Sequence, residues 1–388
     1  MNPAAIPLAL YLHLPWCVRK CPYCDFNSFT ATKTPPRARY IDALRRDLDL
    51  SRDYAAGRPL ASVFLGGGTP SLFAPGEIAQ ILDAVRERFD VPAAAEITME
   101  ANPGTVECGD PAGYRDAGVN RISIGAQSFS DAALAVLGRI HQAAAIHASF
   151  SAARAAGFDN INLDIMYALP GQGVGQALAD IDAAVDLGPE HISWYHLTLE
   201  PNTVFHARPP AGLPGEAVAA DIQDAGSARL VEAGFEQYEV SAWTRDGRPS
   251  AHNLNYWTFG DYLAAGAGAH AKVTTTAGVF RYSRPANPEA YMSALEAESP
   301  SLEPVAVSAA DLAFEFMLNA LRLKGGFSLD GFVARTGLEV ESIAGRLATL
   351  EAQGLLRRLD DGVRIVPSER GFELLNELQA AFLPDAPP

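Results

Sequence analysis

Strand-like and helix-like segments alternate over residues 1–200 of this 388-residue chain. The strand-like segments are short apolar runs at residues 8–14, 62–65, 96–100, 121–125, 160–168 and 191–199. Between them lie Ala- and Leu-rich stretches with helical spacing, among them residues 36–52, 75–89, 143–157 and 174–187. This alternation predicts βαβ units around a parallel sheet. Six such units predict an α/β fold, an incomplete β/α barrel with its chemistry on loops at the carboxyl ends of the strands.

The rest of the chain follows a different pattern. Residues 201–304 are less regular, and from residue 305 the sequence indicates three helices, a short strand pair and a last helix. We therefore predict three parts. A barrel core spans residues 1–200, a segment at residues 201–304 completes the barrel, and a winged-helix-like α+β domain spans residues 305–388.

Composition and charge exclude several function classes. The chain is 48% apolar and 20% charged, which is ordinary for a soluble globular protein. Its net charge of −16 argues against broad nucleic-acid binding and against electrostatic attachment to anionic lipid. No stretch approaches the roughly 18 uninterrupted apolar residues of a membrane-spanning helix. The N-terminus lacks the basic start of a secretory signal, so we expect a cytoplasmic protein.

Three of the four cysteines form a CxxxCxxC pattern directly after the first predicted strand, at Cys17, Cys21 and Cys24. Three thiolates can hold three irons of a cubane and leave the fourth iron open to a ligand. A structural zinc is the alternative, but zinc needs four ligands, and His13 is the only nearby candidate for the fourth. We favour an iron–sulfur cluster and expect the isolated Cys108 to be a small packed residue.

Two further features follow strands. Gly66, Gly67, Gly68 and Thr69 come after an apolar run, and glycines there let the backbone approach a ligand closely. No Lys-Ser/Thr pair follows, so the segment is not a phosphate loop. A ligand-binding segment and a plain tight turn are equal alternatives here. Glu100 ends its strand, where an exposed carboxylate with no ligand is the default interpretation of a lone glutamate.

In combination, these segments resemble the radical SAM superfamily. The stretch YLHLPWCVRKCPYCDF is similar to the oxygen-independent coproporphyrinogen III oxidase-like group within it. The resemblance implies a partial (β/α)6 barrel, with a [4Fe-4S] cluster on Cys17, Cys21 and Cys24. It also implies S-adenosylmethionine (SAM), bound at the open iron and cleaved to methionine and a 5′-deoxyadenosyl radical.

The same resemblance implies a set of SAM contacts. The Gly-rich segment would pair with the amino group of SAM, and Arg139 would pair with its carboxylate. Asp164 would accept from the ribose hydroxyls. The implied SAM-binding residues are Tyr11, Tyr23, Gly67, Gly68, Thr69, Glu100, Gln127, Arg139 and Asp164.

A second motif, HNxxYW, lies at His252, Asn253, Tyr256 and Trp257. Its plain interpretation is a packed aromatic pair with a hydrogen-bonded histidine. Its functional interpretation is a porphyrin contact, because histidine can ligate heme iron. The motif resembles one typical of the heme chaperone branch, HemW, and makes His252 a candidate heme-binding residue.

Two departures from the catalytic branch decide between activities. Coproporphyrinogen III dehydrogenases carry a fourth cysteine two positions after the third, where this chain has Phe26. They also carry an extension ahead of the barrel, whereas only sixteen residues precede Cys17 here. We therefore predict a heme chaperone that transfers heme to apo-proteins such as respiratory cytochromes. The alternative is a coproporphyrinogen III dehydrogenase, so whether the protein is an enzyme stays open, and we assign no catalytic residue.

A winged-helix-like domain also raises the hypothesis of a DNA-binding regulator. Residues 305–388 hold eight Lys and Arg against twelve Asp and Glu, a poor balance for reading a groove. We expect no nucleic-acid partner and give the domain a lid or docking role. The expected partners are heme and its acceptor proteins, with contact at the membrane surface and a monomer or cluster-dependent dimer left open.

Overall fold

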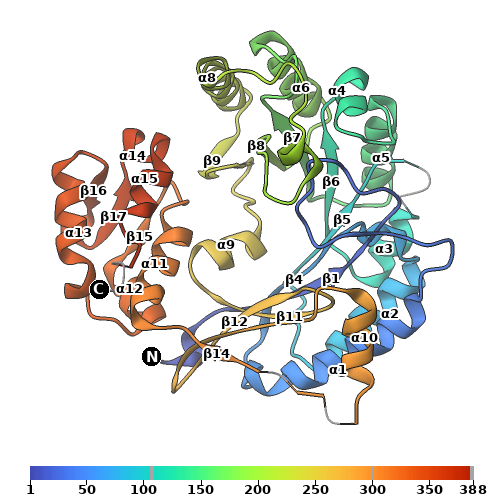
Figure 1. Ribbon diagram of the computed structural model, residues 1–388, viewed down its shortest axis with the longest axis horizontal. Helices are drawn as coiled ribbons and strands as arrows, with labels where there is room; N and C mark the ends of the chain where they lie inside the picture. Colours follow the sequence, from blue (N-terminus) through green and yellow to red (C-terminus); the bar gives the residue numbers. More distant parts are fainter. Residues whose placement is uncertain (105–108, 299, 302, 385–388) are drawn as a thin grey trace.

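The computed structural model describes residues 1–104, 109–298, 300–301 and 303–384 (Figure 1). Cys108 lies outside the described residues. One large sheet of twelve strands organises most of the chain, in the order β14-β13-β12-β11-β1-β4-β5-β6-β7-β8-β10-β9. The structure thus confirms the mixed α/β class with a large parallel sheet.

Six parallel strands form the centre of the sheet, at the six places where the sequence predicts strands. Successive side chains of a strand point to opposite faces, so Leu8, Leu10 and Leu12 share one face of the first strand, where they join the main core. The strands are β1 (Leu8–Leu14), β4 (Leu60–Gly67), β5 (Glu96–Ala101), β6 (Arg121–Gln127), β7 (Ile161–Tyr167) and β8 (His191–His196).

The sheet continues beyond these six strands on both sides. β11 (Asp261–Ala265) pairs in parallel with the free side of β1, and the remaining strands pair antiparallel. They are β9 (Glu236–Glu239), β10 (Ala242–Thr244), β12 (His270–Thr275), β13 (Gly278–Ser283) and β14 (Val305–Ala306). The sequence predicts no individual strand here, because these segments are short and lack a long apolar run.

Helices cover the outside of the barrel, as Figure 1 shows. In α1, Ile41, Leu44, Leu48 and Ala55 recur at helical spacing and face the core. Proline at the first position starts α2, where it loses no hydrogen bond. The outer helices are α1 (Arg37–Ala55), α2 (Pro75–Arg86), α3 (Pro111–Ala117), α4 (Asp131–Val136), α5 (Ala143–Ala155), α6 (Val174–Asp186), α8 (Glu216–Glu232) and α10 (Pro288–Glu296).

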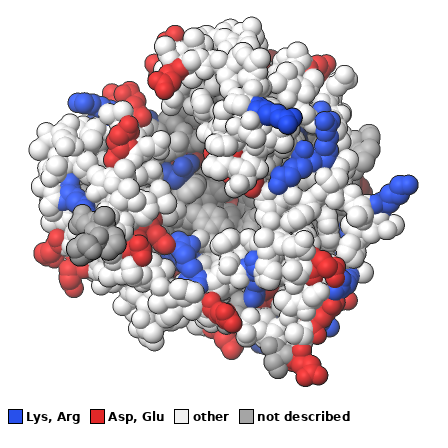
Figure 2. Space-filling model, in the orientation of Figure 1, with Lys and Arg blue, Asp and Glu red and all other residues white. Residues whose placement is uncertain are grey.

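The C-terminal domain has its own three-stranded sheet, β15-β17-β16, and its own core around Phe316, Phe332 and Leu347. Figure 2 shows a hollow at the centre of the face between this domain and the barrel. The element order is that of a winged helix. The elements are α11 (Ala309–Ala320), β15 (Phe327–Ser328), α12 (Leu329–Thr336), α13 (Glu341–Ala352), β16 (Leu356–Leu359), β17 (Arg364–Pro367), α14 (Glu369–Glu373) and α15 (Leu375–Ala380).

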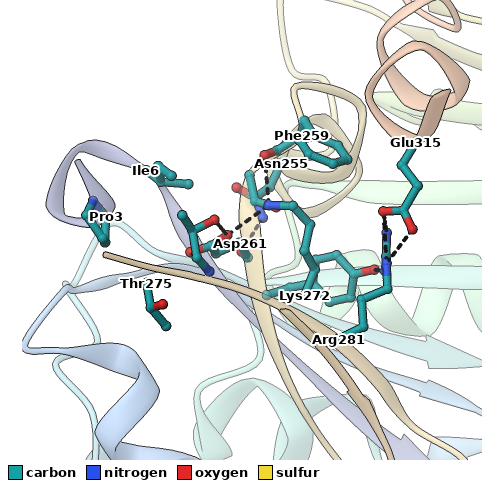
Figure 3. A network of polar contacts seen from close by, with 12 residues as sticks. Pro3, Ile6, Asn255, Phe259, Asp261, Lys272, Thr275, Arg281 and Glu315 are labelled. Carbon is teal, nitrogen blue, oxygen red and sulfur yellow. Dashed lines mark hydrogen bonds and ion pairs between the residues drawn. The ribbon is translucent and has the colours of Figure 1, made fainter. Parts of the chain in front are cut away.

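A buried polar network ties the start of the chain to β11 and β12 (Figure 3). The Asp261 carboxylate accepts hydrogen bonds from Arg58 Nη1 at 2.7 Å and from Lys272 Nζ at 2.8 Å. Arg58 Nη1 also donates to the backbone carbonyls of Pro3 and Ile6. One buried carboxylate therefore holds two buried cations and fixes the N-terminal segment against the sheet.

Candidate functional site

A cavity of about 450 Å³ lies at the carboxyl ends of the parallel strands. Its wall brings together eleven of the thirteen site residues that the sequence predicts, from six separate stretches of chain. The eleven are Cys17, Cys21, Tyr23, Cys24, Gly67, Gly68, Thr69, Glu100, Gln127, Arg139 and Asp164.

The cysteine loop is anchored at both ends. β2 (Trp16–Cys17) pairs in parallel with β3 (Phe29–Thr30), which closes the loop. The side-chain amide of Asn27 donates to the carbonyls of Ala267 and Ala286, both at 2.8 Å. Residues from the second half of the chain therefore hold the loop in place over the cavity.

The three thiols are the candidate metal ligands of this cavity. In the described part of the chain, no three His, Cys, Asp or Glu side chains converge on a point that one metal ion could occupy. A zinc site needs such convergence, with ligands about 2.0–2.3 Å from one ion. In a [4Fe-4S] cubane each thiolate binds a different iron, so the sulfur atoms stay apart. The three cysteines line one cavity, and the cluster that the sequence favours over zinc stays a prediction at this point.

The Gly-rich segment is built into the wall by close backbone packing. Gly67 has a φ of +113°, and its N–H donates to Glu100 Oε2 at 3.1 Å. A Cβ on Gly68 would lie 2.6 Å from the carbonyl oxygen of Trp16. The N–H groups of Gly68 and Thr69 donate to the carbonyls of Leu14 and Trp16. The carbonyl oxygens of the segment can therefore accept hydrogen bonds from a ligand, and an amino group is a suitable donor.

Arg139 is held beside the cysteine loop. Its Nη2 donates to Asn102 Oδ1 at 2.5 Å and to the carbonyl of Gly125 at 3.1 Å, and its Nη1 lies 3.6 Å from Cys21 Sγ. Asn102 in turn donates to the hydroxyl of Thr69 at 2.9 Å. A guanidinium fixed in this way can pair with a ligand carboxylate next to the cysteine loop.

Two partly buried carboxylates, Glu100 and Asp164, face the cavity. Burial and the nearby charge of Asp164 raise the pKa of Glu100 to about 8. Burial also raises the pKa of Asp164, although Ser123 Oγ and Asn162 Nδ2 each donate to it at 2.8 Å. Two carboxylates that line one cavity favour a ligand that brings positive charge or hydrogen-bond donors.

Replacing Glu100 with glutamine is expected to change how the stability of the cofactor-free protein depends on pH. The folded protein binds the proton of Glu100 more tightly than the unfolded chain, because the pKa rises from its ordinary 4.5 to about 8. This contribution to folding is complete below pH 4.5 and is lost as the pH rises towards about 8. Urea titrations across this window should show wild type losing stability that Glu100→Gln keeps, and parallel curves would contradict the raised pKa.

Two predicted residues, Tyr11 and His252, are absent from the described wall of the cavity. Tyr11 lies behind it, where its hydroxyl forms a 3.0 Å hydrogen bond with His13 Nδ1 and its ring stacks on Phe64. His252 is 1% exposed, with Ser62 Oγ and Tyr256 Oη at 2.9 Å from its two ring nitrogens. The roles predicted for both residues stay predictions.

Several residues of the cavity wall were not predicted from the sequence as site residues. Asn102 follows Glu100 by two positions at the same strand end, a signal that could have found it. Tyr195 donates to Gln127 Oε1 at 2.7 Å, and only the pairing of β7 with β8 brings it there. Glu239 and Asn253 come from residues 201–304, where the sequence predicts no strand whose end would mark a site residue.

Comparison with known proteins places this geometry in a family. Residues 11–184 match the model of the Radical SAM superfamily, and residues 307–374 match that of the HemN C-terminal domain. Heme chaperone HemW of Escherichia coli (strain K12) is 45% identical over 378 residues, which cover 97% of this chain and 98% of that protein. The Haemophilus influenzae protein of the same name is 43% identical over 386 residues, 98% of this chain and 99% of that protein.

The fold also matches a solved structure. Coproporphyrinogen III oxidase (HemN) from Escherichia coli, a radical SAM enzyme, superposes with a TM-score of 0.82 over 98% of this chain and 90% of that one. At 23% sequence identity this likeness shows the fold alone. None of the helices in the described ranges is both long and apolar enough to cross a bilayer. The chain belongs to the radical SAM superfamily and, within it, to the heme chaperone HemW family.

Proposed function

We propose that this protein is a heme chaperone, which binds heme and transfers it to apo-proteins such as respiratory cytochromes. The observation that carries the proposal is the similarity to proteins named heme chaperone HemW along 97–98% of the chain. Phe26 supports it. This residue stands where the catalytic branch has a further cysteine, is 58% exposed and lies at the cavity wall.

The radical SAM core would hold the cofactors that its family implies. Cys17, Cys21 and Cys24 would bind the [4Fe-4S] cluster, and the carbonyls of the Gly-rich segment would accept from the amino group of SAM. Arg139 would pair with the SAM carboxylate, since Asn102 and Gly125 already fix its guanidinium. When bound, the cluster and SAM supply one-electron radical chemistry, whereas the chain binds and orients them.

The remaining assignments belong to the same proposal. We assign the cofactor site to the barrel, residues 1–200 and 201–304, and acceptor docking to residues 305–388. The protein would act in the cytoplasm and meet its acceptors at the membrane surface. The net charge of −16 favours recognition of the acceptor protein over attraction to anionic lipid.

Heme binding and transfer can be tested directly. The protein, reconstituted without oxygen, is titrated with heme and followed by its Soret absorbance, then mixed with an apo-cytochrome. We expect saturable heme binding and transfer. In parallel, coproporphyrinogen III, SAM and a strong reductant are supplied, and protoporphyrinogen IX is followed by chromatography. Multiple turnovers of this product would overturn the chaperone proposal in favour of a dehydrogenase.

A further inference from the structure

A left-handed residue stands at the carboxyl end of both β6 and β7. Gln127, the last residue of β6, has a φ of +66°, and Ala168, directly after β7, has a φ of +56°. This conformation is strained for residues other than glycine, and it persists only where surrounding contacts hold it. The pairing of β6 with β7 shifts register between Ile124 and Gln127, so the regular strand ladder does not impose it.

A single buried carboxylate, that of Asp180 in α6, supplies contacts to both turns. Asp180 is 5% exposed. After the first turn, the hydroxyl of Ser128 donates to it, with Oγ 3.0 Å and 2.8 Å from its two oxygens, and the N–H of Phe129 donates at 2.6 Å. After the second turn, Gln172 Nε2 donates to it at 3.2 Å, while Gln172 Oε1 accepts from the N–H of Leu169 at 3.1 Å. Asp180 therefore binds one turn directly and the other through Gln172.

These contacts require Asp180 to act as an acceptor. The N–H of Ser130 donates to Ser128 Oγ at 3.1 Å, so the hydroxyl hydrogen of Ser128 is left for Asp180. The N–H of Phe129 and the amide of Gln172 are donors as well. An ionised carboxylate accepts from all three, whereas the amide group of an asparagine would turn one donor towards another. Asp180→Asn therefore disrupts this network at nearly constant side-chain size.

The side chain that the first turn places is the carboxamide of Gln127, which lines the cavity. Tyr195 Oη donates to Gln127 Oε1 at 2.7 Å, so Nε2 is the atom of this group that can donate to a ligand. A Cβ on Gly125 would lie 2.9 Å from Gln127 Nε2 and 3.5 Å from Arg139 Nη2. The amide nitrogen of Gln127 and the guanidinium of Arg139 therefore lie over the same glycine.

We infer that Asp180 is a positioning residue of the SAM site, which holds the left-handed turn at Gln127 and so keeps Gln127 Nε2 beside Arg139. The inference rests on the proposed function, because it takes SAM as the ligand of this cavity. Asp180 is outside the described wall of the cavity, and it would act on the ligand through Gln127. One residue of the outer helix layer would thereby set the geometry of a donor at the carboxyl ends of the strands.

The test is equilibrium binding of SAM to the reconstituted full-length protein, with the iron content measured in every variant. Asp180→Asn should weaken SAM binding about tenfold, because a strained turn relaxes when its support is lost. Ser128→Ala removes one donor of the same network and should also weaken SAM binding. Asp182→Asn, two positions further along α6 with a side chain that is 46% exposed, is the matched control and should bind SAM like wild type.

A double-mutant cycle separates positioning from a general loss of stability. Gln127→Gly removes the carboxamide and adopts the left-handed turn without strain. In that background Asp180→Asn should cause almost no further loss of SAM affinity, because the group that it positions is gone. Losses that multiply would show that Asp180 acts on the fold alone, and they would overturn the inference.

Wild-type SAM affinity in both Asp180→Asn and Ser128→Ala would also overturn the inference, while the cofactor assignment would stand. If wild-type protein with a full complement of iron fails to bind SAM, the cofactor assignment is overturned together with the inference. The heme titration described above is independent of both outcomes, so a failure of the chaperone proposal is recognised separately.

Discussion

Replacing Asp261 with asparagine is expected to destabilise the protein by about 3–5 kcal/mol, the usual effect of removing one partner from a buried ion pair. Asp261 is fully buried, and the side chains of Arg58, Lys272 and Thr274 all donate to it. The variant leaves two buried cations without their counter-charge (Figure 3). Urea unfolding measures the loss as a change in the free energy of unfolding.

The pH dependence of the same variant gives an independent check. Burial by itself would raise the pKa of Asp261, but Lys272 and Arg58 outweigh it and hold the pKa below its ordinary 3.8. The stability from this carboxylate is therefore present above pH 3.8 and is lost as the pH falls through the lower folded-state pKa. In Asp261→Asn, the free energy of unfolding should therefore lack the fall at low pH that this carboxylate causes in wild type.

An exposed ion pair supplies the matched control for Asp261. Glu289 pairs with Arg39 at 2.7 Å, but its side chain is 64% exposed. Glu289→Gln should therefore change stability by roughly 0–1 kcal/mol. Equal losses in Glu289→Gln and Asp261→Asn would show that burial of the Asp261 network adds nothing.

Replacing Gly68 with alanine is expected to weaken SAM binding about 10- to 100-fold. The new Cβ would meet the backbone carbonyl of Trp16 at 2.6 Å, and backbone cannot rotate away as a flexible side chain can. Overpacking of this kind costs about 1–3 kcal/mol, and relief would move the segment that lines the SAM site. Equilibrium binding of SAM to the reconstituted protein measures the effect, with the iron content checked to show that the cluster remains.

Gly76 provides the control for this substitution. It lies in the first turn of α2, and a Cβ there would meet nothing within 4 Å. Gly76→Ala should bind SAM like wild type and gain a little stability, since alanine favours a helix over glycine. If Gly68→Ala also binds SAM normally, the close packing of the Gly-rich segment is irrelevant to the ligand.

The sequence predicts the central strands and most of the cavity wall because both are local signals. An apolar run marks each of the six central strands, and the residue that ends the run lies at the carboxyl edge of the sheet. Cys17, Gly67 and Glu100 all follow this rule, and the cavity gathers them. Strands β11 to β13 carry no such signal, since they gain stability only by pairing with β1 and with one another.

The HNxxYW motif shows the limit of such signals. The motif is visible in the sequence, but which of its residues faces the cavity depends on how the helix α9 (Ala251–Trp257) is rotated inside the barrel. Glu96 and Ser62 set that rotation, at 156 and 190 positions from His252. As a result His252 points into the packing and Asn253 into the cavity.

The sequence by itself determined the family, the positions of the six central strands along the chain and the cysteine loop, because short motifs and apolar runs encode them. Tertiary structure alone decided how the cavity is closed. Arg322 reaches Glu239 across 83 positions, and Asn27 reaches Ala267 across 240. Contacts at such separations arise from packing between whole elements, and no local pattern of residues specifies them.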